Sequence, residues 1–423
     1  MNRHVTLPYG CATLGVTLPD ANLMGVFAPH ELPPVADPRA EIERALVAPI
    51  AVPPLSEMAR GARRVVLVAD DNTRLTPTAI ILPVLLNALN AAGVSDDAVT
   101  VVIALGTHRK MTEEEIADKF GAEVVRRVPV LNHEAFDPAA LVDLGATESG
   151  VAVGVNRRVV EADLVLGVGS IVPHHIPGFS GGAKIIQPGV CGERTTGEVH
   201  LLSVRHEHSL MGVVENRVRA EMETIAQRAG LRAILNTVLD RQGRLVGAVY
   251  GDPRAAFRQG VGLSRRVYGV ETPGLADIVV SNAYPCEIEF WQAHKTLYAA
   301  ELCVRPGGTI IITAPCPEGV AKTHPDVLEF AAWPKARIDA ALRAGEIDDL
   351  TGGALALAWA TARERATVAT VSEGVSAEET RALGFLPYDS LEDALAAELR
   401  RHGPDAQVAV LPYAPDTLPI LKR

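Results

Sequence analysis

Histidines are concentrated in one part of this 423-residue chain, where their placement favours proton transfer or metal binding. Five of the twelve histidines fall between positions 174 and 208. His174 and the more distant His108 each follow an apolar stretch that is typical of a strand. Because the pKa of an unperturbed imidazole is about 6.5, both side chains are candidates for acid–base catalysis near neutral pH.

A structural hydrogen-bonding role is the alternative for any single histidine. We expect that role for five histidines that do not directly follow a predicted strand. These are His133, His206, His208, His324 and His402.

Other polar residues also follow the predicted strands. Asp70, Asp71 and Arg74 follow one predicted strand, and His108 follows another. Since ligands bind at the carboxyl ends of parallel strands, we expect a carboxylate pair, a guanidinium and two imidazoles in one cleft.

The glycine-rich segment Gly178–Lys184, with the sequence GFSGGAK, departs from two common phosphate-binding motifs. A dinucleotide fingerprint starting at Gly167 requires glycine at position 172, where Val172 stands, and a Walker loop starting at Gly178 requires glycine at position 183. What remains is a flexible backbone able to surround an anion, followed by Lys184 among apolar neighbours. A buried lysine has a lowered pKa and a neutral amine suited to covalent attachment. The alternative is a glycine-rich turn with an exposed lysine.

A third group of polar residues lies in the segment 287–303, whose apolar spacing predicts a helix. Trp291, Gln292 and Lys295 share one face of that helix, because they are separated by three and four residues. An indole, an amide and an ammonium group suit a small anionic ligand. The alternative is an amphipathic helix with a polar flank.

The elements that must position these residues alternate between strand and helix, which predicts an α/β fold with mostly parallel sheets. A glycine-containing turn at 241–243 predicts a β-hairpin between 231 and 250. Pro273 and Gly274 interrupt the pattern, so we expect two α/β domains, residues 1–272 and 273–423, with the active site in the cleft between them. Strands are expected at 64–69, 99–105, 128–131, 163–168, 278–281, 309–313, 367–371 and 408–411, and helices at 77–92, 334–344 and 391–401.

Composition limits the class of protein. A net charge of -11 and a pI near 5.6 disfavour a nucleic-acid groove or a polybasic membrane surface. Five scattered cysteines give neither a disulfide framework nor a thiolate zinc site. The N-terminus has no signal-peptide pattern and no apolar stretch is long enough for a membrane span, so a cytoplasmic protein is expected.

Five segments together resemble the nickel-pincer lactate racemase family. They are DNTRLTP (71–77), GTHR (106–109), HHIPGFSGGAK (174–184), the later His200, and WQAHK (291–295). The resemblance extends over nearly the whole chain, including Tyr9, Gly10 and Leu18–Asp20. The arrangement of a histidine, GFxGGxK and a second histidine is the most specific part.

The resemblance implies a racemase or epimerase of a 2-hydroxy carboxylic acid that works by reversible hydride transfer. It implies a nickel-pincer nucleotide, a pyridinium mononucleotide with thioamide and thiocarboxylate groups, attached covalently to Lys184, with nickel bound by His200. Cofactor-biosynthesis enzymes are the implied partners. By motif position His108 and His174 are the acid/base pair, Gly181, Gly182 and Trp291 contact the cofactor, and Asp71, Arg74, Gln292 and Lys295 handle the substrate.

Two positions depart from lactate-specific members of that family. Ala183 stands where a basic residue is expected, and Trp291 where tyrosine is commoner. They leave the substrate open among lactate, malate, 2-hydroxyglutarate, aromatic hydroxy acids and sugar acids. Two other readings stay open: a zinc metallohydrolase built on His174, His175 and His200, although HExxH is absent, and a non-catalytic protein that binds a nucleotide cofactor.

Overall fold

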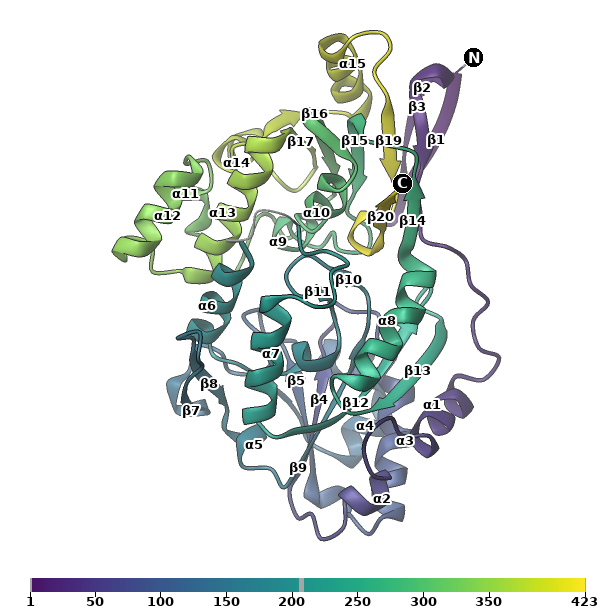
Figure 1. The fold of residues 1–423 in the computed structure, drawn as a ribbon, viewed down its shortest axis with the longest axis vertical. Coiled ribbons are helices and arrows are strands. Elements are labelled where there is room, and N and C mark those ends of the chain that lie inside the picture. The colour runs from purple at the N-terminus through teal and green to yellow at the C-terminus, as the bar shows by residue number, and fades with distance from the viewer. Residues whose placement is uncertain (1, 205–208, 423) are drawn as a thin grey trace.

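Two six-stranded sheets, one from each half of the chain, lie one above the other along the long axis of the molecule (Figure 1). The computed structural model describes residues 2–204 and 209–422. The first sheet has the order β13-β12-β9-β4-β5-β6, and its neighbours are parallel except for the β12–β13 hairpin. Its strands are β4 (Val65–Asp70), β5 (Val99–Ala104), β6 (Val130–Asn132), β9 (Leu164–Ser170), β12 (Leu231–Leu239) and β13 (Leu245–Gly251).

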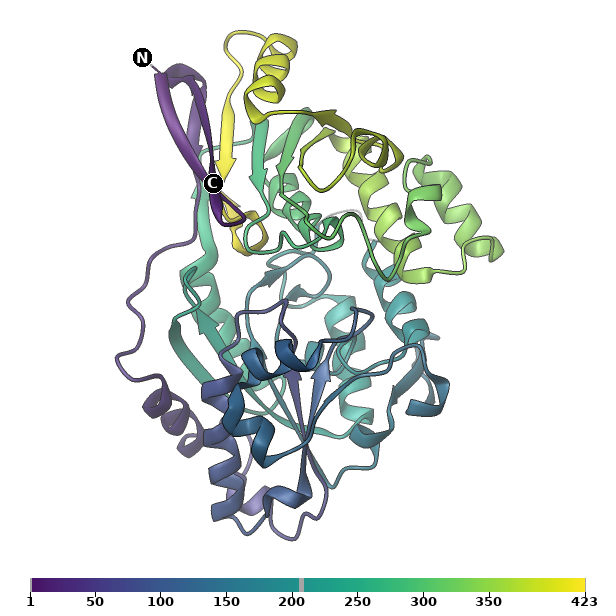
Figure 2. The same ribbon diagram turned by 180° about the vertical axis from the view of Figure 1, so that it is seen from behind.

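Both faces of this sheet are covered, which explains why its strands are continuous apolar runs. In β4, Val65 and Leu67 pack into one core cluster with helix α3, and the alternate residues Val66 and Val68 pack into a second cluster on the other face. Helices α7 and α8 lie in front of the sheet in Figure 1, and Figure 2 shows the helices behind it. The helices of this half are α1 (Pro38–Val47), α2 (Leu55–Met58), α3 (Thr78–Ala91), α4 (Glu113–Arg127), α5 (Arg157–Val160), α6 (Glu193–Val204), α7 (Arg217–Arg228) and α8 (Ala255–Tyr268).

The second sheet is parallel throughout, in the order β18-β17-β16-β15-β19-β3. Its strands are β3 (Leu23–Val26), β15 (Ala276–Asn282), β16 (Val304–Thr313), β17 (Thr367–Val371), β18 (Leu386–Tyr388) and β19 (Val408–Leu411). Its helices are α9 (Phe290–Ala293), α10 (Thr296–Glu301), α11 (Val327–Phe330), α12 (Lys335–Ala344), α13 (Leu350–Arg365), α14 (Ala377–Ala382) and α15 (Leu391–His402).

Residues 2–26 lie with the second sheet, partly as its edge strand β3 and partly as a separate hairpin packed against it, whereas the expected first domain is residues 1–272. Strand β3 pairs with β19, and the hairpin β1–β2 packs Leu7 and Leu18 into a core cluster with Ile278 and Ile311. We therefore propose that residues 2–26 be grouped with the C-terminal domain. The smaller pairs are β1 (Asn2–Tyr9) with β2 (Ala12–Pro19), β7 (Leu141–Ala146) with β8 (Ala152–Asn156), β10 (Pro173–His174) with β11 (Gly178–Phe179), and β14 (Gly269–Thr272) with β20 (Leu418–Leu421).

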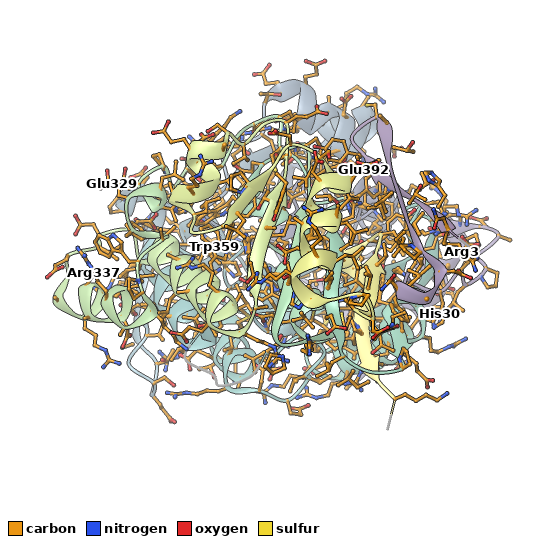
Figure 3. All side chains as sticks on the ribbon, turned by 90° about the horizontal axis from the view of Figure 1, so that it is seen from above. Arg3, His30, Glu329, Arg337, Trp359 and Glu392 are labelled. Atoms are coloured by element: carbon orange, nitrogen blue, oxygen red, sulfur yellow. The ribbon has the colours of Figure 1, made fainter. Side chains whose placement is uncertain are left out.

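The α/β prediction is confirmed: each predicted strand overlaps an observed one, and 231–250 forms the expected hairpin. The helix predicted over 287–303 is instead two short helices, α9 and α10, separated at His294 and Lys295. In the C-terminal half, α13 buries Trp359 completely, whereas Glu329 and Arg337 lie at the periphery (Figure 3). No helix within the described ranges has the length and apolarity that crossing a membrane requires.

Candidate active site

A cavity lies between the two halves of the molecule and is lined by residues from both. It sits at the carboxyl ends of β4, β5 and β9, as the sequence analysis predicts for a ligand site in a parallel sheet. Ten of the eleven predicted site residues line it, the exception being Gly182. They are Asp71, Arg74, His108, His174, Gly181, Lys184, His200, Trp291, Gln292 and Lys295.

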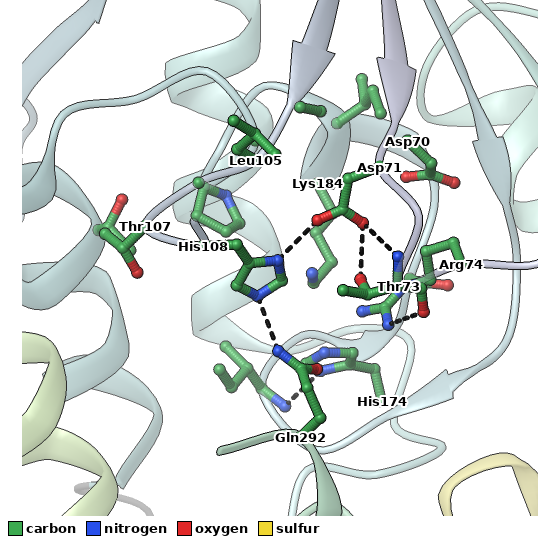
Figure 4. Close-up of a pocket in the computed structure, with 18 of the residues that line it drawn as sticks. Asp70, Asp71, Thr73, Arg74, Leu105, Thr107, His108, His174, Lys184 and Gln292 are labelled. Carbon is green, nitrogen blue, oxygen red and sulfur yellow. Dashed lines mark hydrogen bonds and ion pairs between the residues drawn. The ribbon is translucent and has the colours of Figure 1, made fainter. Parts of the chain in front are cut away.

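His108 is held by a buried carboxylate (Figure 4). Its Nδ1 lies 2.7 Å from Asp71 Oδ2, and the Asp71 side chain is 4% exposed. Burial opposes ionisation of Asp71, but the charge and hydrogen bond of His108 and the Thr73 hydroxyl hold its pKa well below the usual range. Since an ionised carboxylate only accepts hydrogen bonds, the proton of neutral His108 sits on Nδ1 and Nε2 keeps its lone pair.

His174 has the opposite hydrogen-bonding pattern. The Ile176 backbone N–H donates to its Nδ1 at 3.1 Å, so a neutral ring carries its proton on Nε2. The short antiparallel pair β10–β11, directly after β9, places this residue in the cavity. Burial, reinforced by the charge of Lys184, lowers the pKa of His174 well below its usual value. The two imidazoles are therefore set as one acceptor and one donor.

The glycine-rich loop brings Lys184 into the same cavity. Gly181 has φ +76° and space for no side chain, since a Cβ there would lie 2.8 Å from Asn236 Oδ1. Gly182 does not line the cavity; its N–H donates to Asn236 at 2.8 Å. The buried Arg219 holds the loop in place, because it donates to the carbonyls of Gly181, at 2.9 Å, and Phe179.

Lys184 itself lies in the short helical turn η4 (Gly182–Ile185) that follows this loop. Its ammonium group has no hydrogen bond or ion pair with any residue of 2–204 or 209–422. Burial, with the nearby charges of Arg74 and Lys295, lowers the pKa of Lys184 well below the usual value. A lowered pKa favours the neutral, nucleophilic form of this amine.

His200 faces the cavity from helix α6. Its Nδ1–H donates to the Thr196 carbonyl at 2.7 Å, which leaves the Nε2 lone pair available. Burial lowers the pKa of His200 to about 4, so the ring is neutral at pH 7. A neutral imidazole whose other nitrogen donates to a carbonyl is the usual form of a histidine metal ligand.

The C-terminal half contributes an amide and an amine opposite these groups. Gln292 Nε2 lies 3.1 Å from His108 Nε2, and the ammonium of Lys295 donates to Gln292 Oε1. Burial, followed by the charge of Arg74, lowers the pKa of Lys295 to about 8. Arg74 reaches the cavity from the loop after β4, so two cations from different halves line one space. This arrangement suits a small carboxylate.

One neighbour of the cavity carries a feature that the sequence analysis did not predict. The indole of Trp291 stacks on His324, with ring centroids 4.1 Å apart, and His324 Nδ1 lies 2.7 Å from Asp349 Oδ2. His133 also has a buried structural position, with Nε2 2.8 Å from the Cys191 carbonyl. Of the remaining histidines assigned a structural role, His402 contacts Thr309, and His206 and His208 lie outside the described residues.

A zinc-hydrolase site finds no support in this geometry. Within residues 2–204 and 209–422, no group of three or more His, Cys, Asp or Glu side chains is placed to hold a metal ion. His174 and His175 stack ring on ring at 4.6 Å, and the pKa of each is lowered by burial. A metal that takes one ligand from the protein and the others from a cofactor needs only His200.

Comparisons with known proteins agree with the resemblance seen in the sequence. Residues 9–212 match the model of the lactate racemase N-terminal domain, and residues 272–416 match that of the lactate racemase C-terminal domain. The lactate racemase of Lactiplantibacillus plantarum is 29% identical, covering 96% of this chain and 97% of the relative. That of Thermoanaerobacterium thermosaccharolyticum is 31% identical, covering 75% of each chain.

Solved structures give the same picture of the fold. The lactate racemase apoprotein from Thermoanaerobacterium thermosaccharolyticum superposes with a TM-score of 0.89 at 27% identity, and the match covers 100% of both chains. A protein from Thermotoga maritima shares the fold, with a TM-score of 0.73 at 21% identity over 93% of this chain and all of its own.

Proposed function

This chain belongs to the lactate racemase family and is an isomerase of the racemase type, and from that premise we propose that it inverts C2 of a 2-hydroxy carboxylic acid by hydride transfer. The lactate of its relatives is the first substrate to test. The observation that carries the proposal is the pair of imidazoles with opposite proton positions in one cavity, beside Lys184 and His200.

The two histidines act on the hydroxyl group of the substrate. His108 accepts the hydroxyl proton at Nε2, where Asp71 stabilises the imidazolium that forms. The oxygen of the inverted product takes its proton from Nε2 of His174 in the imidazolium form, so the donor returns to a neutral ring. One histidine of the pair therefore starts each turnover neutral and the other protonated. The reverse reaction uses the same two atoms in the opposite order. Two bases on different sides of the carbon are what inversion of a stereocentre requires.

Arg74 and Lys295 hold the carboxylate, with Gln292 beside them. The negative charge of that carboxylate makes loss of a proton from C2 unfavourable, since a second anion would form next to the first. Loss of a hydride avoids this charge accumulation and leaves a planar 2-keto acid. In the free protein the Gln292 amide occupies the lone pair of His108, so it must move aside when the substrate hydroxyl binds.

The residues present fit a nickel-pincer nucleotide. Lys184 offers a buried amine whose lowered pKa favours covalent attachment, and His200 offers a free Nε2 for the metal. When bound, that group supplies the acceptor that takes the hydride from C2 and returns it. Gly181 lets the backbone approach closely, and Trp291 presents its indole to the same cavity. The partners implied are the enzymes that build this cofactor.

The proposal is tested by producing the protein together with those enzymes in the cytoplasm of an expression host. We expect one nickel per chain, a mass increase confined to the peptide that contains Lys184, and racemisation of at least one enantiopure acid from a panel that begins with lactate. An unmodified Lys184 peptide would refute the cofactor assignment, provided that a lactate racemase produced in parallel is loaded.

Single substitutions separate the roles. His108→Ala and His174→Ala should each abolish racemisation but keep the adduct, because neither residue is proposed to hold the cofactor. Lys184→Ala should lose the adduct. His30→Ala, at an exposed position, is the control and should leave both unchanged. Full activity in either catalytic-histidine variant would rule out the two-base mechanism.

A further inference from the structure

A second aspartate–histidine pair adjoins the cavity, in the C-terminal half. Asp349 Oδ2 lies 2.7 Å from His324 Nδ1, and His324 Nε2 lies 3.3 Å from the hydroxyl of Thr107, which lines the cavity beside His108. His324 and Thr107 are buried, at 2% and 5% exposed, and the side chain of Asp349 is 16% exposed. The contact joins one half of the molecule to the loop that carries His108 in the other.

The direction of these hydrogen bonds follows from Asp349. Its Oδ1 accepts the Gly352 N–H at 2.8 Å, which caps helix α13, and its Oδ2 faces His324. Burial raises the pKa of Asp349, but the hydrogen bond from His324 outweighs this effect and leaves the pKa below its usual value. An ionised carboxylate only accepts, so a neutral His324 carries its proton on Nδ1 and its Nε2 accepts. The Thr107 hydroxyl must then donate to His324, and its lone pairs remain for a ligand.

We propose that the Asp349–His324 pair is a positioning device that orients the Thr107 hydroxyl as a hydrogen-bond acceptor for an O–H or N–H group of the ligand bound in the cavity. The same His324 ring stacks on Trp291, so one side chain fixes both a wall of the cavity and the hydroxyl next to His108. This inference rests on the proposed function for its kinetic consequences but not for the tautomer it assigns.

The test is Asp349→Asn, which reverses the direction of the hydrogen bonds from residue 349 through His324 to Thr107 with little change in side-chain shape. The Asn oxygen still caps α13, and its NH₂ group donates to His324 Nδ1. The His324 proton then moves to Nε2, which donates to Thr107 and reverses that hydroxyl. Asp37→Asn is the matched control, because Asp37 caps α1 through the Ala40 N–H, three residues on as in the Asp349 cap, at an exposed position.

The first readout is the ¹⁵N chemical shift of the two His324 ring nitrogens, with the signals assigned from their loss in His324→Asn. We expect the Nδ1–H tautomer in the wild-type protein and in Asp37→Asn, and the Nε2–H tautomer in Asp349→Asn. An Nε2–H tautomer in the wild-type protein would overturn the proposal. This measurement needs no activity, so it decides the tautomer even if no 2-hydroxy acid is racemised.

The second readout is kcat/KM in a double-mutant cycle with Thr107→Val. Asp349→Asn should lower kcat/KM about tenfold in the Thr107 background, as expected for one misdirected buried hydrogen bond, and have almost no effect in the Thr107→Val background. Equal losses in both backgrounds would mean a purely structural role and overturn the proposal. If Asp349→Asn does not fold, the comparison of Thr107→Ser with Thr107→Val replaces it. Thr107→Ser keeps the hydroxyl and should retain activity, and equal activity of these two variants would overturn the proposal.

Discussion

Replacing Asp71 by asparagine should disable His108 without removing it. In Asp71→Asn the amide NH₂ group can donate to His108 Nδ1, which moves the ring proton to Nε2 and leaves no base for the substrate hydroxyl. The Asn oxygen can still accept from Thr73, as Asp71 Oδ1 does at 2.6 Å, so the loop after β4 keeps its turn.

The magnitude follows from the geometry of the pair. The 2.7 Å contact is short and the Asp71 side chain is almost fully shielded, so the bond to the imidazolium belongs to the charged class worth about 1.5–3 kcal/mol. That loss alone corresponds to a rate decrease of about 10- to 150-fold. The wrong tautomer adds to it, and the same change in a Ser-His-Asp triad costs about 10⁴-fold. We therefore expect kcat to fall by about 10²- to 10⁴-fold.

Chiral chromatography of the acid over time gives the rates in both directions. For a substrate with one stereocentre the enantiomers have equal free energies, so kcat/KM must fall equally from either side, which is an internal check. Asp240→Asn is the matched control, because Asp240 is a buried carboxylate in the β12–β13 turn that bonds Arg244 and does not line the cavity. Activity of Asp71→Asn within threefold of the control would refute this account of His108.

Three further outcomes are expected. The pKa of Lys295 is lowered to about 8, mainly by burial, so its charge is present below that pH and lost above it. We expect kcat/KM to fall as the pH rises through about 8, whereas kcat/KM of Lys295→Arg should stay constant to higher pH. The pH–rate profiles of the two proteins check this. Arg74→Ala should lower kcat/KM at least about 10-fold in steady-state assays by removing a carboxylate partner, and an unchanged value would exclude that role. Arg219→Met should lower the free energy of unfolding by at least about 2 kcal/mol in denaturant titrations, since two buried carbonyls of the glycine-rich loop lose their donor; an unchanged midpoint would contradict this.

Local patterns predicted much of the fold because each strand buried on both faces is a continuous apolar run. The run VVLVA of β4 and the hairpin of β12 and β13 show this directly. The pairing of β3 with β19 was not predicted, since it joins residues nearly the whole chain apart and leaves no periodic trace. The break between α9 and α10 was also missed; the pattern of 287–303 continues through it because both short helices are buried.

For the site, position after a strand was an informative signal. It brought Asp71, Arg74 and His108 together correctly, because parallel strands end at one edge of a sheet. Gly182 does not line the cavity, and sequence alone does not reveal which glycine of a loop faces it. His324 was assigned a structural role because its partners Asp349 and Thr107 are remote in sequence. A histidine 25 residues from its carboxylate has no recognisable spacing.

The most direct test of the central claim follows the hydrogen on C2. An enantiopure 2-hydroxy acid that the loaded protein racemises is prepared with deuterium at C2 and converted in ordinary water. If hydride transfer operates and the histidines move only the hydroxyl proton, the inverted product should keep its deuterium at C2. Replacement of that deuterium by hydrogen from water would show that a base removes a proton from carbon, and it would contradict the roles assigned to His108 and His174.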